Sequence, residues 1–377
     1  MQKIKITYIV SKIDKALEFE WVAMYLDKNK YELSFVILGT IQGTALKNKL
    51  DELGIANQEI YLAGKRDYPK AWWQTRQCIK RWNPDIVHCH LLDATLIGLS
   101  VSKWAGIQHR IYTRHHSTFH HVYAPRATRY DRWANKTASK IVAVSPLVKK
   151  VLVEKEHVDP GKVMVINHGL DLQFFAQVGK ERIQAIKHKL GLQERYPVIG
   201  SVARYDHWKG VSYTIEAFKN LIHTYPNAKL VLANAGKGDS AAEVSTLART
   251  LPEGSYIEVD FEPDVPALYA CFDVLVHVPV DDHSEAFGQV YIEAMASQVP
   301  VVGTRSGIGN EILLNLETGY VTNYQDADSI VQGICYWMEH TSEKNQVTRN
   351  AFELVRNTYT FEHKLALLTQ LYHSLCP

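Results

Sequence analysis

The chain has 377 residues, more than one hydrophobic core usually supports, so we expect two domains. Hydrophobic residues make up 46% and charged residues 22%, a balance typical of a globular protein that excludes long disordered stretches. The net charge of +2 conceals an asymmetry. Residues 1–180 carry 27 Lys and Arg against 16 Asp and Glu (net +11), and residues 181–377 carry 15 against 24 (net −9). Different partners are expected for the two halves, with nucleic acid or an anionic membrane surface as candidates for the basic half.

Short apolar runs alternate with amphipathic stretches from the start of the chain. The predicted strands of the first half are residues 5–10, 33–38, 84–88, 111–113, 140–145 and 162–166. The predicted helices are residues 17–26, 91–104 and 146–154. Strands that alternate with helices in this way predict parallel βαβ units.

The pattern restarts after residues 168–195, which we interpret as the joint between two open α/β sheets. The predicted strands of the second half are residues 198–202, 228–233, 255–259, 274–277 and 299–303. The predicted helices are residues 211–225, 240–250, 265–271 and 289–297, and a last helix at about 362–375 could pack on either half. Open parallel sheets bind ligands at the carboxyl ends of their strands, so the cleft between the two domains is the expected site.

Glu285 and Glu293 flank the start of a predicted helix that follows a strand. Phe287 and Gly288 open that helix, whose N-terminus offers free backbone N–H groups and a positive dipole to an anion or a sugar hydroxyl. The two carboxylates could accept hydrogen bonds from hydroxyls on one extended ligand. The alternative is two solvated carboxylates, since acidic side chains are favoured near helix starts in any case.

Three further loops follow strands of the same half. Arg204 and Lys209 lie in one strand-to-helix loop, where a guanidinium fork and an ammonium suit a diphosphate. Gly236 lies in a second loop, where glycine lets the backbone approach a ligand closely, and residues 304–311 form a third. Each loop alone could be an ordinary connection. Because they follow successive strands of one sheet, all of them should open on one edge.

As a set, these residues resemble the retaining glycosyltransferases with the GT-B fold, of the family-four type that includes bacterial surface-polysaccharide and phosphatidylinositol mannosyltransferases. Glu285 and Glu293 match the E-x7-E signature of this family, and Arg204 and Lys209 match its diphosphate-binding Arg and Lys. Residues 306–311 resemble its G-G-[IV]-P-E loop, with Ser in place of the first glycine and Asn in place of the proline.

The first half carries further matches to the family. Residues 84–90 resemble its P-D-[IV]-[IV]-H-x-H strand, residues 142–145 match its V-A-V-S pattern, and residues 165–171 match I-x-N-G-[VI]-D with His168 inserted. The Gly-Gly loop that often follows the first strand is absent at residues 11–15, so acceptor binding there could differ.

A group of histidines follows a short predicted strand. Family members usually carry one histidine here, which reaches the transferred sugar across the cleft; His115 aligns best with it and His116 is second. For His120 and His121, packing or solvated histidines are the alternative.

The resemblance implies two Rossmann-like α/β domains facing an interdomain cleft, and transfer of a sugar from a nucleotide-diphosphate sugar with retention of configuration. Arg204 and Lys209 would neutralise the leaving diphosphate without a metal, Glu285 would hold hydroxyls of the transferred sugar, and Glu293 would hold the ribose. The resemblance also implies front-face attack, with the leaving phosphate helping to deprotonate the acceptor, and no obvious second carboxylate for double displacement can be assigned from the sequence. The expected catalytic residues are His115, Glu285, Arg204 and Lys209, and the expected donor-binding residues are Arg204, Lys209, Gly236, Glu285, Ala286, Phe287, Gly288 and Glu293.

The expected domains are an acceptor-side domain at residues 1–175, a nucleotide-sugar-binding domain at 176–355 and a C-terminal helix at 356–377 that could cross back to the first. The expected acceptor is a glycan or lipid-linked glycan of cell-surface polysaccharide synthesis. No cofactor, metal or nucleic acid is expected to bind.

The sequence also predicts where the chain works. It has five cysteines without a Cys-x-x-Cys pair, no signal-peptide pattern, and no apolar run near the roughly 18–20 residues of a membrane span, which predicts a cytoplasmic protein. Tryptophans among Lys and Arg at residues 65–82 and 126–133 predict weak contact with an anionic membrane at its inner face. The alternative is an amphipathic helix whose tryptophans pack on the sheet.

Other classes of protein remain open at this stage. A GT-B-like nucleotide-sugar epimerase or phosphorylase would share the fold, and so would a non-catalytic nucleotide-sugar-binding protein. The presence of every charged donor residue argues against the last.

Overall fold

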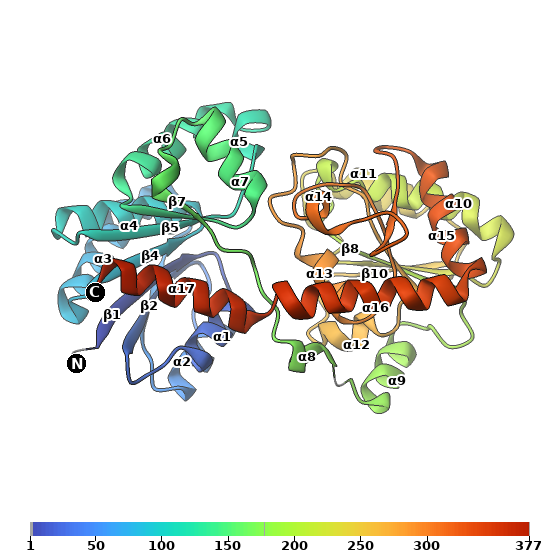
Figure 1. Ribbon diagram of the computed structural model, residues 1–377, viewed down its shortest axis with the longest axis horizontal. Helices are drawn as coiled ribbons and strands as arrows, with labels where there is room; N and C mark the ends of the chain where they lie inside the picture. The colour runs from blue at the N-terminus through green and yellow to red at the C-terminus, as the bar shows by residue number, and fades with distance from the viewer. Residues whose placement is uncertain (1–2, 177, 377) are drawn as a thin grey trace. The chain divides into compact units, whose positions relative to one another are not determined.

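The computed structural model describes residues 3–176 and 178–376, which form two compact units, each with its own sheet. Unit 1 holds the chain up to Gly169 together with the segment from Phe361, and unit 2 is Leu170–Thr360 (Figure 1). The chain therefore changes unit a few residues from the domain limits predicted at residues 175 and 356, and the last predicted helix belongs to unit 1.

Unit 1 contains a seven-stranded parallel sheet in the order β3-β2-β1-β4-β5-β6-β7. Its strands are β1 (Ile4–Ser11), β2 (Tyr31–Gly39), β3 (Ala56–Tyr61), β4 (Ile86–His90), β5 (His109–Arg114), β6 (Lys140–Ala143) and β7 (Val163–Val165). Its helices are α1 (Leu17–Tyr25), α2 (Ala45–Glu52), α3 (Tyr68–Trp82), α4 (Leu92–Trp104), α5 (Phe119–Val122), α6 (Thr128–Thr137), α7 (Pro146–Lys150) and α17 (Phe361–Leu375).

Helices cover both faces of this sheet, which explains why its central strand β4 is buried along its whole length. On β1, the ring of Tyr8 meets Phe19 of α1 edge-on, and its hydroxyl shares a 2.7 Å hydrogen bond with Tyr372 of α17. The next residue, Ile9, faces α4, where a Cβ at Gly98 would lie 2.9 Å from Cδ1 of Ile9. Successive side chains of β1 thus point to opposite faces of the sheet, and α17 lies across one of these faces (Figure 1).

Unit 2 contains a six-stranded parallel sheet in the order β10-β9-β8-β11-β12-β13. Its strands are β8 (Val198–Val202), β9 (Lys229–Ala233), β10 (Tyr256–Val259), β11 (Val274–His277), β12 (Val301–Gly303) and β13 (Tyr320–Val321). Its helices are α8 (Leu172–Ala176), α9 (Lys180–Lys189), α10 (Val211–Thr224), α11 (Ala241–Ala248), α12 (Val265–Tyr269), α13 (Gln289–Ala296), α14 (Gly309–Ile312), α15 (Ala327–Glu339) and α16 (Thr341–Thr358).

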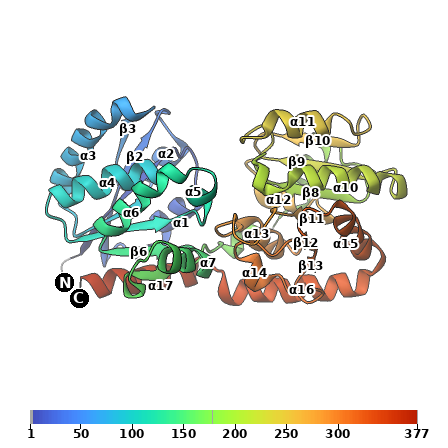
Figure 2. The same cartoon turned by 90° about the horizontal axis from the view of Figure 1, so that it is seen from above.

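The core of unit 2 forms where α10 and α15 pack on the sheet. Ile215, Phe218 and Leu221 recur at helical spacing on the buried side of α10. Trp337 of α15 is fully buried, and its indole N–H donates to the carbonyl oxygen of Val301 at 3.2 Å. Figure 2 shows α10 beside the β8–β9 part of the sheet and α15 beside β12 and β13. This packing holds the strand ends of unit 2 in fixed positions.

The apolar pattern located most strands to within a few residues but missed β3 and β13. β3 is an edge strand with alternating exposed residues, and β13 has only two residues, so neither contains a continuous apolar run. Within the described part of the chain, no helix has both the length and the apolar character needed to cross a membrane.

Candidate active site

The strand order of unit 2 indicates where its candidate site lies. Winding reverses between β8 and β11, because β9 and β10 extend the sheet on one side and β12 and β13 on the other. Open parallel sheets bind ligands at the carboxyl ends of the strands at such a reversal. Arg204 and Lys209 follow β8, and Glu285 follows β11. Three of the predicted residues therefore come from the two strands that flank the reversal.

Two basic side chains contact the carboxylate of Glu285. Nζ of Lys209 lies 2.5 Å from Oε2 of Glu285, and Nε2 of His277, the last residue of β11, lies 3.4 Å from the same oxygen. Burial alone would raise the pKa of Glu285, but Lys209 and His277 outweigh it and lower that pKa to about 2. Burial also lowers the pKa of His277. At neutral pH the site therefore presents an ionised carboxylate in a fixed position.

Two glycines shape the space around Glu285. Gly288 has φ 86° and Gly307 has φ 58°, backbone conformations that favour glycine. A Cβ at Gly307 would lie 2.9 Å from Cγ of Glu285 and 2.6 Å from the carbonyl oxygen of Phe287, and a Cβ at Gly288 would lie 3.2 Å from the same Cγ. Larger residues at either position would displace the carboxylate.

The two departures from the family loop take part in the same structure. The hydroxyl of Ser306 accepts a 3.4 Å hydrogen bond from the backbone N–H of Glu285, and the side-chain amide of Asn310 donates to two loop carbonyls at 3.1 Å each. Ala286 and Phe287 are buried, and the Phe287 carbonyl accepts from the N–H of Ile308 at 2.7 Å. The loops after β11 and β12 are thus tied together.

Glu293 lies within α13, the helix that follows the Glu285 loop. The hydroxyl of Tyr269 donates to its Oε2 at 2.8 Å, and the side-chain amide of Gln289 donates to its Oε1 at 3.1 Å. Burial raises the pKa of Glu293. Each carboxylate oxygen keeps a second lone pair, so a ligand hydroxyl could still donate to it.

Arg204 and Gly236 border more open space. The Arg204 side chain is 59% exposed and pairs with Asp206 at 2.7 Å. Gly236 has φ 74°, and a Cβ there would meet no atom within 4 Å among its described neighbours. The backbone N–H of Tyr205 donates to the carbonyl oxygen of Lys237 at 2.5 Å, which joins the loops after β8 and β9. An exposed guanidinium and an unobstructed glycine are better suited to contact with a charged ligand than to packing in a hydrophobic core.

In unit 1, the predicted His115 belongs to a network of largely half-buried polar side chains. Its Nε2 lies 3.2 Å from Nδ1 of His90, and its ring stacks on His168 at 5.6 Å between centroids. Nδ1 of His168 lies 2.5 Å from Oε2 of Glu18, whose Oε1 is 2.5 Å from Nζ of Lys364 on α17. Burial lowers the pKa of His115 to about 3, and the nearby His168 acts in the same direction. His115 is therefore a neutral imidazole, and the inserted His168 links it to Glu18.

The histidines after His115 bind buried carboxylates. Nδ1 of His120 lies 2.7 Å from Asp131, and Nε2 of His121 lies 3.0 Å from Glu156. Arg114 pairs with both acids, at 2.9 Å and 2.5 Å. His120 is buried and packs beside Asp131, which agrees with the packing alternative for that residue, and His121 is half-buried beside Glu156.

Two groups of described side chains lie close enough together to share a metal ion. They are His116 with His120 and Asp131, and Asp281 with Asp282 and His283. In the first group the Arg114 guanidinium already neutralises Asp131. In the second, the residues are half-buried or exposed, a setting in which acidic groups are common without an ion.

Comparisons with known proteins match the two units separately. The family model described as "Glycosyl transferases group 1" matches residues 182–354, and the model described as "Glycosyltransferase Family 4" matches residues 22–174. The chain belongs to the group 1 glycosyltransferases. The family predicted from the motifs is therefore confirmed.

Relatives and solved structures extend this match. The lipopolysaccharide core biosynthesis mannosyltransferase LpcC of Rhizobium leguminosarum is 24% identical over 318 residues, which are 82% of this chain and 85% of LpcC. The capsular polysaccharide biosynthesis glycosyltransferase CapM of Staphylococcus aureus is 24% identical over 63% of this chain, and the match spans 62% of CapM. The crystal structure of Anabaena HepE in complex with UDP and glucose has a TM-score of 0.84 at 19% identity, covering 98% of this chain and all of HepE. Its likeness confirms the predicted GT-B class of two Rossmann-like domains.

The sequence patterns did not predict every residue of this candidate site. They missed His277, which contacts Glu285, and Tyr269, which binds Glu293. His277 could have been found from the sequence, because it is a histidine at the end of an apolar strand that precedes the Glu285 loop. Tyr269 could not, since it comes from a different helix.

Proposed function

We propose that this group 1 glycosyltransferase transfers a sugar from a nucleotide-diphosphate sugar to an acceptor with retention of anomeric configuration. The observation that carries the proposal is the Lys209–Glu285 pair at the reversal between β8 and β11. A lone ion pair could be structural. This one lies where open parallel sheets bind ligands, on the same edge of the sheet as the loops that carry the exposed Arg204 and the unobstructed Gly236.

The chemistry follows from the charges around the pair. As the bond from sugar to phosphate breaks, negative charge grows on the leaving diphosphate, and Arg204 and Lys209 supply fixed positive charge to it without a metal. Glu285 stays ionised and accepts hydrogen bonds from hydroxyls of the transferred sugar, while Glu293 accepts from the ribose. His115 remains a prediction as a contact to the transferred sugar. The leaving phosphate helps to deprotonate the acceptor on the same face.

For the acceptor, we propose a glycan or lipid-linked glycan of cell-surface polysaccharide synthesis. LpcC, named for lipopolysaccharide core biosynthesis, and CapM, named for capsular polysaccharide, support this class. Weak peripheral contact with an anionic membrane would bring a lipid-linked acceptor within reach. Exposed tryptophans support that contact: Trp73 is 57% and Trp104 is 61% exposed, and the guanidinium of Arg76 lies 4.1 Å from the Trp104 ring centroid.

One experiment tests the proposal and its alternatives. The full chain is incubated with UDP-, GDP- and ADP-sugars and with lipid-linked and free glycan acceptors, and proton NMR follows donor loss and the anomeric signal of the product. Acceptor-dependent transfer that keeps the donor's configuration supports the proposal. Inversion would overturn retention. Epimerised donor without an acceptor, or turnover only with inorganic phosphate, would establish an epimerase or a phosphorylase instead. No turnover with bound nucleotide sugar would indicate a binding protein.

A further inference from the structure

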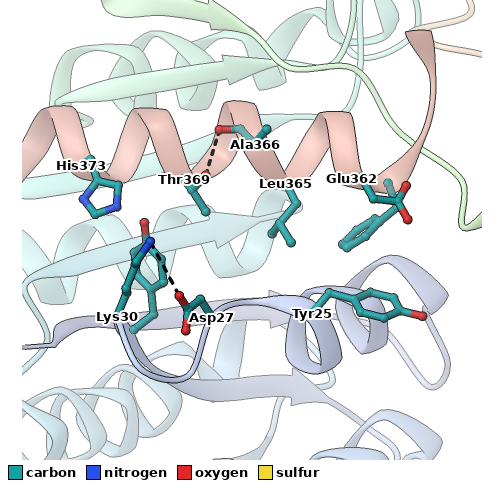
Figure 3. A pocket seen from close by; sticks show the side chains of 10 residues that line it. Tyr25, Asp27, Lys30, Glu362, Leu365, Ala366, Thr369 and His373 are labelled. Carbon is teal, nitrogen blue, oxygen red and sulfur yellow. Dashed lines mark hydrogen bonds and ion pairs between the residues drawn. The ribbon is translucent and has the colours of Figure 1, made fainter. Parts of the chain in front are cut away.

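The buried face of α17 contains a lysine at a position where packing on the sheet would favour an apolar residue. The buried residues of this helix recur at helical spacing, and they are Phe361, Lys364, Leu368, Leu371 and Tyr372. Another side of the helix borders a pocket that is lined in part by Leu365, Ala366 and Thr369 (Figure 3). Lysines are almost never fully buried unless their charge is paired. Lys364 therefore needs a partner inside unit 1.

That partner is Glu18, the second residue of α1. Nζ of Lys364 lies 2.5 Å from Oε1 of Glu18, and the two side chains are only 7% and 20% exposed. Apolar residues on both sides of Lys364, together with the hydroxyl pair of Tyr372 and Tyr8, already dock the helix on the sheet. A buried ion pair adds little net stability, because the desolvation of both charges offsets their attraction. The docking of α17 alone therefore does not account for the pair.

Glu18 connects Lys364 to histidines at the carboxyl edge of the unit 1 sheet. Oε2 of Glu18 lies 2.5 Å from Nδ1 of His168, and Nζ of Lys364 lies 3.4 Å from the same nitrogen. The His168 ring stacks on that of His115, with centroids 5.6 Å apart and planes inclined by 22°. Nε2 of His115 also lies 3.2 Å from Nδ1 of His90. The imidazole of His115 is thus held by one ring that stacks on it and one that hydrogen-bonds to it.

The charge of Glu18 sets the orientation of the stacking ring. Burial alone would raise the pKa of Glu18, but Lys364 and His168 outweigh it and hold that pKa well below its ordinary range. An ionised carboxylate can only accept hydrogen bonds, so Nδ1 of His168 must carry the proton between them. A protonated Glu18 could donate as well as accept, and the His168 ring would lose this constraint. Lys364 therefore acts, through Glu18, on the ring that stacks on His115.

We propose that Lys364, Glu18 and His168 are positioning residues that hold the His115 imidazole in the orientation that sugar transfer requires. The inference rests on the proposed function, in which His115 contacts the transferred sugar. Displacing such a contact by about 1 Å can cost about 100-fold in rate. The last helix of the chain thus contributes to the site of unit 1 through Lys364, in addition to covering the sheet.

NMR of the full chain with isotope-labelled histidine tests the arrangement without any substrate. The ring protons of His115 are assigned by their loss in His115→Asn, and stacking on His168 gives them a ring-current shift. That shift should change in Lys364→Met, which keeps an unbranched side chain in the apolar face of α17, and in the double variant Glu18→Leu with Lys364→Met, which leaves neither charge buried alone. Leu368→Ala, on the same buried face, is the matched control and should leave the His115 signals in place. Unmoved His115 signals in either network variant would overturn the proposal.

Steady-state kinetics connect the arrangement to the reaction. In both network variants kcat should fall about 10- to 100-fold while KM for the nucleotide sugar stays unchanged, because the donor is bound by unit 2. Lys364→Arg keeps the positive charge and should recover most of the turnover, and Leu368→Ala should keep the wild-type kcat per folded molecule. A loss in Leu368→Ala equal to that in Lys364→Met, or no recovery in Lys364→Arg, would overturn the proposal. The ring signals are recorded without substrate, so a wild type that turns over no donor would refute the proposed function separately.

Discussion

Nζ of Lys209 and Oε2 of Glu285 lie 2.5 Å apart, although 76 residues separate them in the chain. They meet because their loops leave β8 and β11, which are neighbours in the sheet. Partly buried ion pairs contribute little net stability, since desolvation offsets their attraction. We propose instead that the pair serves a ligand, with a fixed carboxylate for sugar hydroxyls and a cation for the diphosphate.

Glu285→Gln should lower turnover about 10- to 150-fold, because it removes a charge-assisted hydrogen bond worth about 1.5–3 kcal/mol. The same change leaves the Lys209 ammonium, only 16% exposed, without its ionic partner, so the unfolding free energy should fall by about 1–3 kcal/mol. Steady-state kinetics and urea unfolding measure the two effects.

The double variant Glu285→Gln with Lys209→Met separates stability from function. Removing both charges should restore most of the unfolding free energy but none of the turnover. If the double variant regained both, the pair would be structural only.

Much of this site could be predicted from the sequence, because loops after parallel strands share one edge. Arg204, Lys209 and Glu285 were predicted together on that argument, and all three follow the strands beside the reversal. The apolar pattern does not give the order of strands in a sheet, so the contact between Lys209 and Glu285 could not be predicted from it.

Contacts between segments that are distant in the sequence could not be predicted either. The sequence shows His168 as an insertion in a family pattern, but its partner Glu18 lies 150 residues earlier in the chain. Lys364 joins Glu18 only because α17 returns to unit 1, and the apolar face of that helix could have packed on either unit. Periodicity reports which face of an element is buried and says nothing about its neighbour.

Stability should depend on pH through Glu285 in a defined direction. Its pKa is about 2 in the folded protein and 4.5 ordinarily, so its contribution is present above about pH 4.5 and is lost as the pH falls toward 2. The difference in unfolding free energy between wild type and Glu285→Gln should therefore shrink from pH 6 to pH 3.

Glu293→Gln provides the matched control for this titration. Burial raises the pKa of Glu293, so any stability this carboxyl contributes is present at low pH and lost as the pH rises. From pH 6 to pH 3, the difference in unfolding free energy between wild type and variant should therefore shrink for Glu285→Gln and grow for Glu293→Gln. Parallel curves would mean that the Lys209–Glu285 pair does not control the titration.

Activity should survive excess EDTA, because in the proposed mechanism Arg204 and Lys209 take the place of a divalent cation at the diphosphate. Donor turnover is measured before and after chelation and again after magnesium or manganese is added back. Complete loss with recovery on metal addition would refute metal-independent handling of the diphosphate.

Unit 1 should bind anionic vesicles weakly and release them as salt rises, since exposed charges are screened over about 10 Å at 0.1 M. Co-sedimentation with anionic and neutral vesicles at two salt concentrations measures this. Trp73→Ala should reduce binding, whereas Phe261→Ala, an equally exposed aromatic (56%) in unit 2, should not. Equal failure to bind either vesicle would favour a soluble acceptor.

The most direct measurement is a calorimetric titration of nucleoside diphosphates, beginning with UDP, against wild type, Arg204→Ala and Arg249→Ala. Arg204 is exposed at the strand reversal, and Arg249 is an exposed arginine after α11 in the same unit. We predict that one nucleoside diphosphate binds wild type and Arg249→Ala alike, and that Arg204→Ala weakens it by about tenfold or more, as expected for loss of a charge-assisted contact. Binding that is indifferent to Arg204, or no binding of UDP, GDP or ADP, would contradict a donor site at this edge of the sheet.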